Sequence, residues 1–351
     1  MDTEPNRIAV IGVPGFVGQH LARALRTTGW SVHGVTSSRN SFLLEHLGIP
    51  AAEGKFPVVI NLAYPTGTSP LRRRKDNASI IARIREFAAP GAVIVHASTL
   101  AVFGFSLERE PVCGPIRWRP DQDYIESKVW MENQLVDALA GNHRVDIVRL
   151  GNVWGPGSVH WLAGMASRLR TSLPTLAEGG GYSNVTDVHN VVSYFESLAR
   201  RTETMSGAFY HHLAEFSSES WDTFVTPVSK FLGCEPVSAF VPPAPKLASF
   251  LFGKVAVEAL KAINDSRGPG SLLRQILNQL PESSIARMRR EKLAAATGGY
   301  FEEPVLAKVL GCQREFRSQT LSGWTPPLSL AESLSRAVSW LDWAGYSSSL
   351  K

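Results

Sequence analysis

Short runs of apolar residues alternate with segments of helical periodicity through the first half of the chain. The runs fall at residues 7–11, 31–35, 58–63, 92–96 and 145–150, with a further one near Ile49. Such β-branched runs predict strands, and the periodic segments between them, including one at about 76–89 and one that begins near Tyr124, predict helices. Alternating strands and helices are typical of a parallel sheet covered by helices on both faces. The predicted fold class is therefore α/β, with a doubly wound sheet.

Beyond Asn190 this alternation gives way to helical patterns separated by loops. Residues 240–253 are apolar but interrupted by prolines, and the stretch is too short to span a bilayer. Leucine and isoleucine recur at helical spacing from Leu272 to Leu280, which is more typical of a buried core than of an oligomer face or a membrane-lying surface. The pattern predicts a second, smaller and mostly helical domain in the C-terminal part.

Composition adds a globular chain of 351 residues that is 44% hydrophobic and 19% charged, with ample material for a large core. The formal net charge of +5 is spread along the sequence apart from the basic run at residues 72–75. No basic stripe is interleaved with aromatic residues, so we expect a small anionic ligand and no nucleic-acid partner. The basic run is more typical of a solvated helix face than of a phosphate contact.

The cysteines and the N-terminal sequence indicate the cellular compartment. Cys113, Cys234 and Cys312 are far apart and odd in number, which argues against a disulfide framework and for a reducing compartment. None has metal-ligand spacing and His211-His212 lacks a third ligand, so no metal is expected and both histidines are interpreted as structural. We find no signal-peptide pattern and no uncharged stretch of the roughly 18 residues that a membrane span requires. The predicted location is the cytoplasm.

Three glycines, Gly12, Gly15 and Gly18, follow the first predicted strand at intervals of three residues. In a strand–turn–helix unit the first allows a tight turn and the second lets the backbone approach a dinucleotide pyrophosphate at the helix N-terminus. The third allows close packing of the helix on the strand. The spacing differs from the common G-x-G-x-x-G form and a plain turn is the alternative, but the position in the first βα unit favours a dinucleotide site.

No carboxylate follows the second predicted strand, where enzymes that use NAD usually bind the ribose 2′-hydroxyl. Ser37, Ser38 and Arg39 stand there instead. An arginine with hydroxyl neighbours suits a 2′-phosphate, so NADP(H) is the expected cofactor. NAD(H) is the alternative, and Arg39 is then a solvated loop residue.

Tyr124 and Lys128 lie four residues apart in a predicted helix, so they share one face. Tyrosine is a poor acid or base at neutral pH, but a neighbouring ammonium favours the phenolate and lowers its pKa. Thr99 stands at the carboxyl end of a predicted strand, where α/β proteins bind ligands, and its hydroxyl can polarise a carbonyl. A threonine that satisfies local backbone is the alternative for Thr99. Together the three residues predict a site for proton transfer.

The order of these motifs resembles that of the extended short-chain dehydrogenase/reductase family, also called the NAD-dependent epimerase/dehydratase family. The resemblance rests on the glycine turn, Asn61-Leu62-Ala63, Thr99 before Val102-Phe103-Gly104, the Tyr124/Lys128 pair, and residues 152–157, and it continues through 187–191 to about 340. It implies a Rossmann domain and a substrate-binding domain. The boundaries that we expect are 1–155, with 182–213 returning, for the first and 156–181 with 214–351 for the second.

The resemblance also implies roles for single residues. Tyr124 is the general acid/base, Lys128 tunes it and holds the nicotinamide ribose, and Thr99 takes a place often filled by serine. The implied cofactor-binding residues, besides Tyr124 and Lys128, are Gly12, Gly15, Phe16, Val17, Gly18, Ser37, Ser38, Arg39, Leu62 and Ala63, and the implied substrate-binding residues are Thr99, Asn152 and Trp154.

Departures from the family pattern bear on the reaction and on the substrate. Leu100-Ala101 replace the Asp-Glu pair of sugar-nucleotide 4,6-dehydratases, which removes the acid and base that water elimination needs. Ser183 stands where many members that act on nucleotide sugars carry an arginine for the pyrophosphate. The first departure argues against a dehydratase, and the second weakens the case for a nucleotide sugar.

The sequence thus predicts an enzyme, an epimerase or ketoreductase, that transfers a hydride between NAD(P)(H) and a secondary alcohol or ketone. A nucleotide-linked sugar or a related polar carbonyl compound is the leading substrate class. An NADPH-dependent reductase of a hydrophobic ketone, from steroid or specialised metabolism, is the alternative. A dinucleotide-sensing protein without turnover is a third, disfavoured by the intact catalytic set. The expected partner is the small-molecule substrate, and a second copy of the chain in a homodimer is a further possibility.

Overall fold

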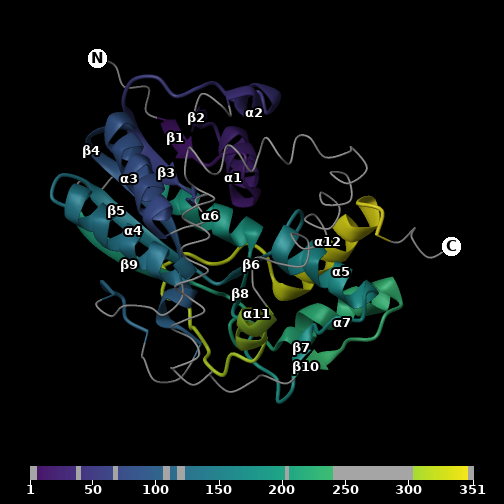
Figure 1. Cartoon of the computed structure of the whole chain (residues 1–351). Coiled ribbons are helices and arrows are strands. Elements are labelled where there is room, and N and C mark those ends of the chain that lie inside the picture. Colours follow the sequence, from purple (N-terminus) through teal and green to yellow (C-terminus); the bar gives the residue numbers. More distant parts are fainter. Residues whose placement is uncertain are drawn as a thin grey trace, which may run out of the picture.

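The computed structural model describes residues 6–36, 41–65, 70–105, 111–116, 123–201, 205–239 and 303–346. Six parallel strands form the main sheet in the order β2-β1-β3-β4-β5-β9 (Figure 1). They are β1 (Arg7–Ile11), β2 (Ser31–Val35), β3 (Phe56–Asn61), β4 (Ala88–Thr99), β5 (Arg144–Leu150) and β9 (Gly207–Leu213). This arrangement confirms the predicted α/β fold with a doubly wound parallel sheet.

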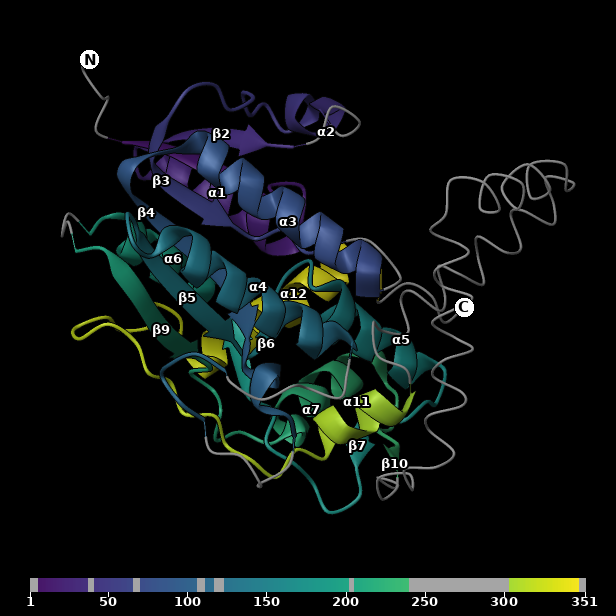
Figure 2. The ribbon, with the colours of Figure 1, turned by 60° about the vertical axis from the view of Figure 1, so that its left-hand side comes forward.

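Helices cover both faces of the sheet (Figures 1 and 2). On one face, α1 (Phe16–Thr27) and α6 (Val188–Ala199) pack their apolar sides into a core that contains Leu21 and Phe195. On the other, α3 (Pro70–Phe87) and α4 (Asp123–Leu139) form a core that contains Ile84 and Leu135. All four of these side chains have no exposed surface, and burying a leucine, isoleucine or phenylalanine stabilises a fold by roughly 1.5–3 kcal/mol.

Three elements differ from the prediction. The first is β9, which forms a strand of the main sheet beyond Asn190, where only helical patterns were expected. The helix expected at about 76–89 begins at Pro70, because proline is well suited to the first helical position, and its basic run lies in the first turns. There Arg72 pairs with Asp76, and Arg74 pairs with Glu126 of α4, each at 3.0 Å. These pairs account for part of the basic run without a ligand.

The strand expected near Ile49 is wrong. The chain forms the short helix α2 (Ser41–His46) and then meets β2 only at a bridge between Gly34 and Ala51. Leu44 packs into the space that a Cβ on Gly34 would occupy, so it covers the face of β2 at this position.

A second group of elements lies beyond the carboxyl ends of the strands, with Trp154, Trp221, Phe224 and Leu341 in its core. It contains two small parallel pairs, β6 (Asn152–Trp154) with β8 (Val185–Asp187) and β7 (Leu176–Ala177) with β10 (Ser238–Ala239). Its helices are α5 (Gly164–Arg170), α7 (Trp221–Leu232), α11 (Glu303–Leu310) and α12 (Leu330–Trp343). The apolar stretch 240–253 and the periodic leucines at 272–280 lie outside the described residues. Among the helices that are described, none is both long and apolar enough to cross a membrane.

The two adjacent histidines lie on β9. His211 Nδ1 is 2.8 Å from the Tyr194 hydroxyl and its Nε2 is 2.9 Å from an Asp146 oxygen. His212 is also buried, and burial lowers its pKa to about 4. Both side chains therefore join the packing between the last strand and its neighbours, in line with their interpretation as structural.

Candidate active site

The three glycines shape the turn between β1 and α1. Gly12 has a φ of 93°, in the left-handed region that favours glycine, and a Cβ there would lie 2.9 Å from the Ala63 nitrogen. A Cβ on Gly18 would lie 2.3 Å from the Gly12 carbonyl oxygen. Gly15 is the N-cap of α1, and its N–H donates to the Gly12 carbonyl at 3.0 Å. Gly12 and Gly18 therefore lie where the backbone leaves no room for a Cβ, and the role of Gly15 at a pyrophosphate stays a prediction.

This turn leaves the N-terminus of α1 available to an anion. Gly15 has no side chain to cap the helix, and the first turn, which begins with Phe16 and Val17, contains no acidic residue. The first N–H groups of a helix lack intrahelical acceptors and carry the positive end of its dipole. A dinucleotide pyrophosphate fits such an end.

Asn61 fixes the loop that faces the glycine turn. Its Nδ2 lies 2.9 Å from His96 Nδ1, and its Oδ1 accepts from the Ala63 N–H at 3.1 Å. Both Asn61 and His96 are buried, and burial lowers the pKa of His96 well below its usual range, so a neutral ring can accept from the amide. Leu62 and Ala63 are thereby held against Gly12. This is the point between β1 and β3 where the strand order reverses and doubly wound sheets bind ligands.

Tyr124 and Lys128 lie one turn apart on α4. Lys128 Nζ donates to the Ala97 carbonyl at 3.1 Å, which places the ammonium at the carboxyl end of β4. Burial lowers the pKa of Lys128 to about 8, and the Glu132 carboxylate acts in the opposite direction. Tyr124 is partly buried and packs against a small apolar cluster that contains Leu100. A phenol beside an ammonium that titrates near neutral pH is suited to proton transfer.

Glu132 is a residue that the sequence analysis missed. It is fully buried one turn after Lys128, and it accepts from the Ser98 hydroxyl and from both Nε and Nη2 of Arg149, at 3.1 and 2.7 Å. Arg149 also donates to the carbonyls of Val112 and Gly114. The buried ion pair therefore supports the helix under the Tyr–Lys pair and holds the segment at 111–116. The spacing of Tyr124, Lys128 and Glu132, four residues each, was the signal that could have found it.

Thr99 lies beside a small pocket of about 30 Å³. Its Oγ1 accepts from the Ala101 N–H at 3.2 Å and caps the short helix η2 (Leu100–Phe103). The alternative role of satisfying local backbone is therefore present in the structure. A hydroxyl that accepts one bond still has its own proton to donate, so Thr99 can also polarise a carbonyl.

Asn152 lines the same pocket, whereas Trp154 does not. Asn152 Nδ2 donates to the Ser183 carbonyl at 2.6 Å, which leaves its Oδ1 for a ligand. Trp154 has no exposed surface, and its ring packs 5.3 Å from that of Phe224. This burial argues against a direct contact of Trp154 with substrate and gives it a supporting position beneath Asn152.

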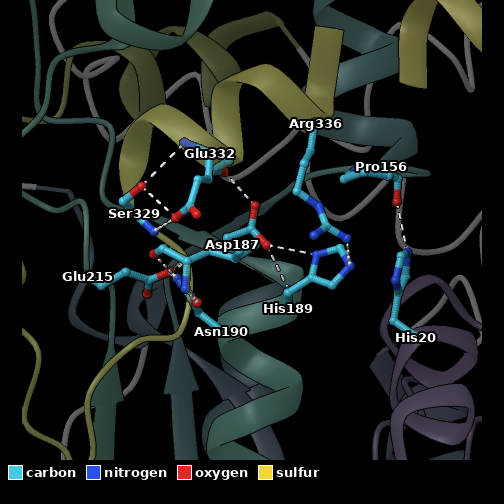
Figure 3. A network of polar contacts seen from close by, with 11 residues as sticks. His20, Pro156, Asp187, His189, Asn190, Glu215, Ser329, Glu332 and Arg336 are labelled. Atoms are coloured by element: carbon cyan, nitrogen blue, oxygen red, sulfur yellow. Dashed lines mark hydrogen bonds and ion pairs between the residues drawn. The ribbon is translucent and has the colours of Figure 1, made fainter. Parts of the chain in front are cut away.

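Asp187 begins α6 and ties it to the C-terminal helix α12 (Figure 3). Its carboxylate accepts from the N–H of His189 at 2.7 Å, from His189 Nδ1 at 3.1 Å, and from the Ser333 hydroxyl. His189 Nε2 lies 2.8 Å from an Arg336 nitrogen. Arginine can only donate, so this imidazole nitrogen accepts and the other donates to Asp187.

Asn190 and Glu215 extend the network to the loop before α12. Asn190 Oδ1 accepts from the Leu328 N–H at 2.9 Å, and its Nδ2 donates to Glu215 at 2.7 Å. Glu215 also accepts from the Asp187 N–H at 2.7 Å, and burial raises its pKa. At the start of α12, Ser329 and Glu332 form a capping box, which fixes the first turn of that helix.

His20 connects the network to α1, the helix that follows the glycine turn (Figure 3). Its Nε2 donates to the Pro156 carbonyl at 2.9 Å, and its ring meets that of His189 edge-on at 5.2 Å. Burial lowers the pKa of His20. The loop that follows Asn152 is thus attached to α1 two residues after Gly18, so this loop and the glycine turn are held together.

A doubly wound sheet, a glycine turn at its switch point and a Tyr–Lys pair beside it define the class of Rossmann-fold dinucleotide-binding proteins. The sequence profile of the NAD dependent epimerase/dehydratase family matches residues 8–191, just over half of the chain. The chain belongs to this family, as its motifs indicated. Among curated proteins, none matches the sequence.

Solved structures of nucleotide-sugar epimerases share the fold. The UDP-glucose 4-epimerase of Thermus thermophilus in complex with NAD is 19% identical with a TM-score of 0.52, over 68% of this chain and 87% of that one. The UDP-glucose-4-epimerase of Stenotrophomonas maltophila, with bound NAD and formylated UDP-arabinopyranose, is 17% identical with a TM-score of 0.54 over the same shares. The UDP-glucuronic acid 4-epimerase of Bacillus cereus in complex with NAD is 16% identical with a TM-score of 0.51, again over 68% and 87%. At these identities the likeness establishes the fold alone.

Proposed function

We propose that the protein is a nicotinamide-dependent oxidoreductase of the epimerase type that acts on the secondary alcohol or ketone of a nucleotide-linked sugar. The observation that carries the proposal is the Tyr124/Lys128 pair on α4, with Lys128 anchored to the Ala97 carbonyl at the end of β4. Family membership supports the cofactor class. The similar structures hold NAD, and they are epimerases of UDP-linked sugars, which supports the substrate class.

Each residue has a separate task in this mechanism. The cofactor, when bound, supplies or accepts the hydride; the N-terminus of α1 would hold its pyrophosphate and Lys128 its ribose. Tyr124 exchanges a proton with the substrate oxygen, and the Lys128 ammonium favours the phenolate through its charge. Thr99 donates a hydrogen bond to the same oxygen. Residues 156–181 and 214–351 supply the substrate side.

The choice between NADP(H) and NAD(H) depends on Ser37, Ser38 and Arg39, which lie outside the described residues. The preference for NADP(H) stays a prediction from the sequence. The similar structures named above hold NAD, so both dinucleotides belong in any binding measurement.

A reductase of a hydrophobic ketone is the second candidate, because the described lining of the pocket beside Thr99 carries no charged side chain. Its apolar lining includes Leu100, Phe105, Val309 and Phe316. Ser183 is fully buried, so it is a poor substitute for an arginine on a pyrophosphate. Arg168 is also a poor candidate for a pyrophosphate contact, because it is buried and donates to the Pro174 carbonyl at 2.6 Å.

The proposal is tested by Tyr124→Phe in the full chain, assayed with nicotinamide cofactors against UDP-hexoses and against apolar ketones. Loss of the hydroxyl should lower turnover by about 10² to 10⁴, while cofactor binding and thermal stability persist because the ring is kept. Tyr346→Phe makes the same change at a ring that packs against Trp340 of α12, and it should leave turnover unchanged. Epimerisation without net cofactor consumption supports the first candidate, and net oxidation of NAD(P)H by apolar ketones supports the second. Turnover of Tyr124→Phe at the wild-type rate, with chemistry limiting, contradicts both.

A further inference from the structure

Tyr64 contacts both members of the Tyr124/Lys128 pair. Its ring lies 5.3 Å from the Tyr124 ring, with an angle of 48° between the planes, and the Lys128 Nζ lies 5.3 Å from the centre of the Tyr64 ring. Both distances fall within the range of favourable aromatic and cation–π contacts. Tyr64 comes from the loop after β3, so it meets the pair from a different element than the helix that carries it.

The position of Tyr64 is fixed by its neighbours. It directly follows the turn in which Asn61 binds both His96 and the Ala63 N–H. The next residue, Pro65, is buried, and a following proline confines the backbone of Tyr64 to extended conformations. The half-buried ring is therefore held over the ammonium by a constrained backbone at residues 61–65.

The groups around Lys128 act on its charge in different directions. On α4, Glu132 favours the ammonium, although its carboxylate is shared with Arg149 of β5 and Ser98 of β4. On β4, the Ala97 carbonyl accepts from the ammonium, while His96 is kept neutral by burial and by Lys128 itself.

Among the described residues, the ring of Tyr64 also lies near the ammonium. Tyr64 presents its face to Lys128, and a ring face attracts a cation. The same ring also excludes water, which disfavours the cation. The two effects of Tyr64 oppose each other, and only the first requires an aromatic ring.

We propose that Tyr64 is a positioning residue that holds Lys128 in its charged form and fixes the ring of Tyr124. This inference rests on the proposed function, since a charged Lys128 is needed there to favour the Tyr124 phenolate. Without the ring face, the ammonium stays dry but loses its attraction, so its pKa falls and the alkaline limit of the reaction moves to lower pH.

The test compares Tyr64→Phe, which keeps the ring, with Tyr64→Leu, which keeps an apolar side chain but has no π face. In protein labelled with carbon-13 lysine, the NMR signal that disappears in Lys128→Met reports the titration of Lys128 without cofactor or substrate. We expect Tyr64→Phe to titrate like the wild type and Tyr64→Leu to titrate lower by roughly half a pH unit. Tyr64→Met offers the same loss of the ring with a flexible side chain, if Tyr64→Leu does not fold.

A Tyr64→Leu or Tyr64→Met protein in which Lys128 titrates at or above the wild-type pH overturns the proposal, because then the ring acts only by excluding water. The turnover assay gives the second reading: the alkaline limb of kcat/KM should shift in the same order as the NMR titrations. If Tyr124→Phe retains full turnover while the NMR order holds, the proposed function fails and the Tyr64 contact stands, so the two failures are distinguishable.

Discussion

The glycine turn at α1 and the junction at Asp187 are both polar, but they are built in opposite ways. At the turn, Gly12 has a left-handed backbone, α1 begins without a side-chain cap, and the nearby Lys128 is held at a lowered pKa. At the junction, Asp187 accepts from three donors and Asn190 uses both ends of its amide (Figure 3). An uncapped helix end and a buried ammonium cost stability and are typical of functional sites. Polar groups that have their hydrogen-bond partners stabilise the fold. We therefore propose that the turn belongs to the reactive region and that the junction is its brace.

The largest effect is expected from breaking the brace with Asp187→Ala. The change removes the N-cap of α6 and leaves the buried Ser333 hydroxyl without its acceptor, so the free energy of unfolding should fall by about 2–4 kcal/mol. Thermal unfolding measures the loss, and amide hydrogen exchange should show faster opening of α12. Ser333→Ala removes only one of the bonds and should cost less. Unchanged exchange in α12 would show that Asp187 does not brace it.

The next effect comes from filling the turn with Gly18→Ala. The new methyl group would lie 2.3 Å from the Gly12 carbonyl oxygen and 2.6 Å from that of Val13, and backbone atoms cannot rotate away. We expect a loss of about 1–3 kcal/mol in the free energy of unfolding and weaker binding of both NAD and NADP, measured by calorimetric titration. Gly141→Ala is the matched control, because nothing lies within 4 Å of its Cβ position. Wild-type cofactor affinity in Gly18→Ala would contradict this account of the turn.

The smallest effect has the opposite sign. Lys128→Met should lose turnover and weaken cofactor binding, yet raise the free energy of unfolding near neutral pH by about 1–2 kcal/mol, because the folded state disfavours this ammonium. The folded pKa is about 8 against an ordinary value of 10.5, so the unfolded chain binds more protons between these values. Wild-type stability should rise with pH across that window, and the variant should lack this rise. Denaturant titrations at both ends of the window measure this rise. An equal change of unfolding free energy with pH in the wild type and the variant would refute the assignment.

The reactive region could be predicted because its determinants are close together in the sequence. Gly12 to Gly18 span one turn, and Tyr124 with Lys128 span one turn of helix, so spacing alone carries the geometry. Thr99 ends one strand and Asn152 follows another, and both line the pocket at the carboxyl edge of the sheet. The prediction of the sheet has two errors. No strand forms near Ile49, where the backbone at residues 50–52 bonds to Gly34 of β2 alone, and β9 lies in a region where only helical patterns were expected.

The brace and Tyr64 could not be predicted, because their partners are far apart in the sequence. The loop after β3 meets α4 only through the packed sheet, and nothing in the pattern around Tyr64 names Lys128. The same holds for Arg149, whose bonds to Val112 and Gly114 depend on how a loop folds over β5. Trp154 shows the reverse case: its motif suggested a ligand contact, and its burial against Phe224 depends on a helix that comes much later in the sequence.

The bond between Ser333 and Asp187 joins residues 146 positions apart, and this separation bears on the order of assembly. Closing a loop of that length has an entropic cost that only a preformed docking surface can offset. When the chain is synthesised from its N-terminus, the strands that carry the glycine turn emerge well before α12 exists. Asp187 therefore stays without this partner until α12 has been synthesised. The glycine turn is expected to form first, and the docking of α12 on α6 to follow it.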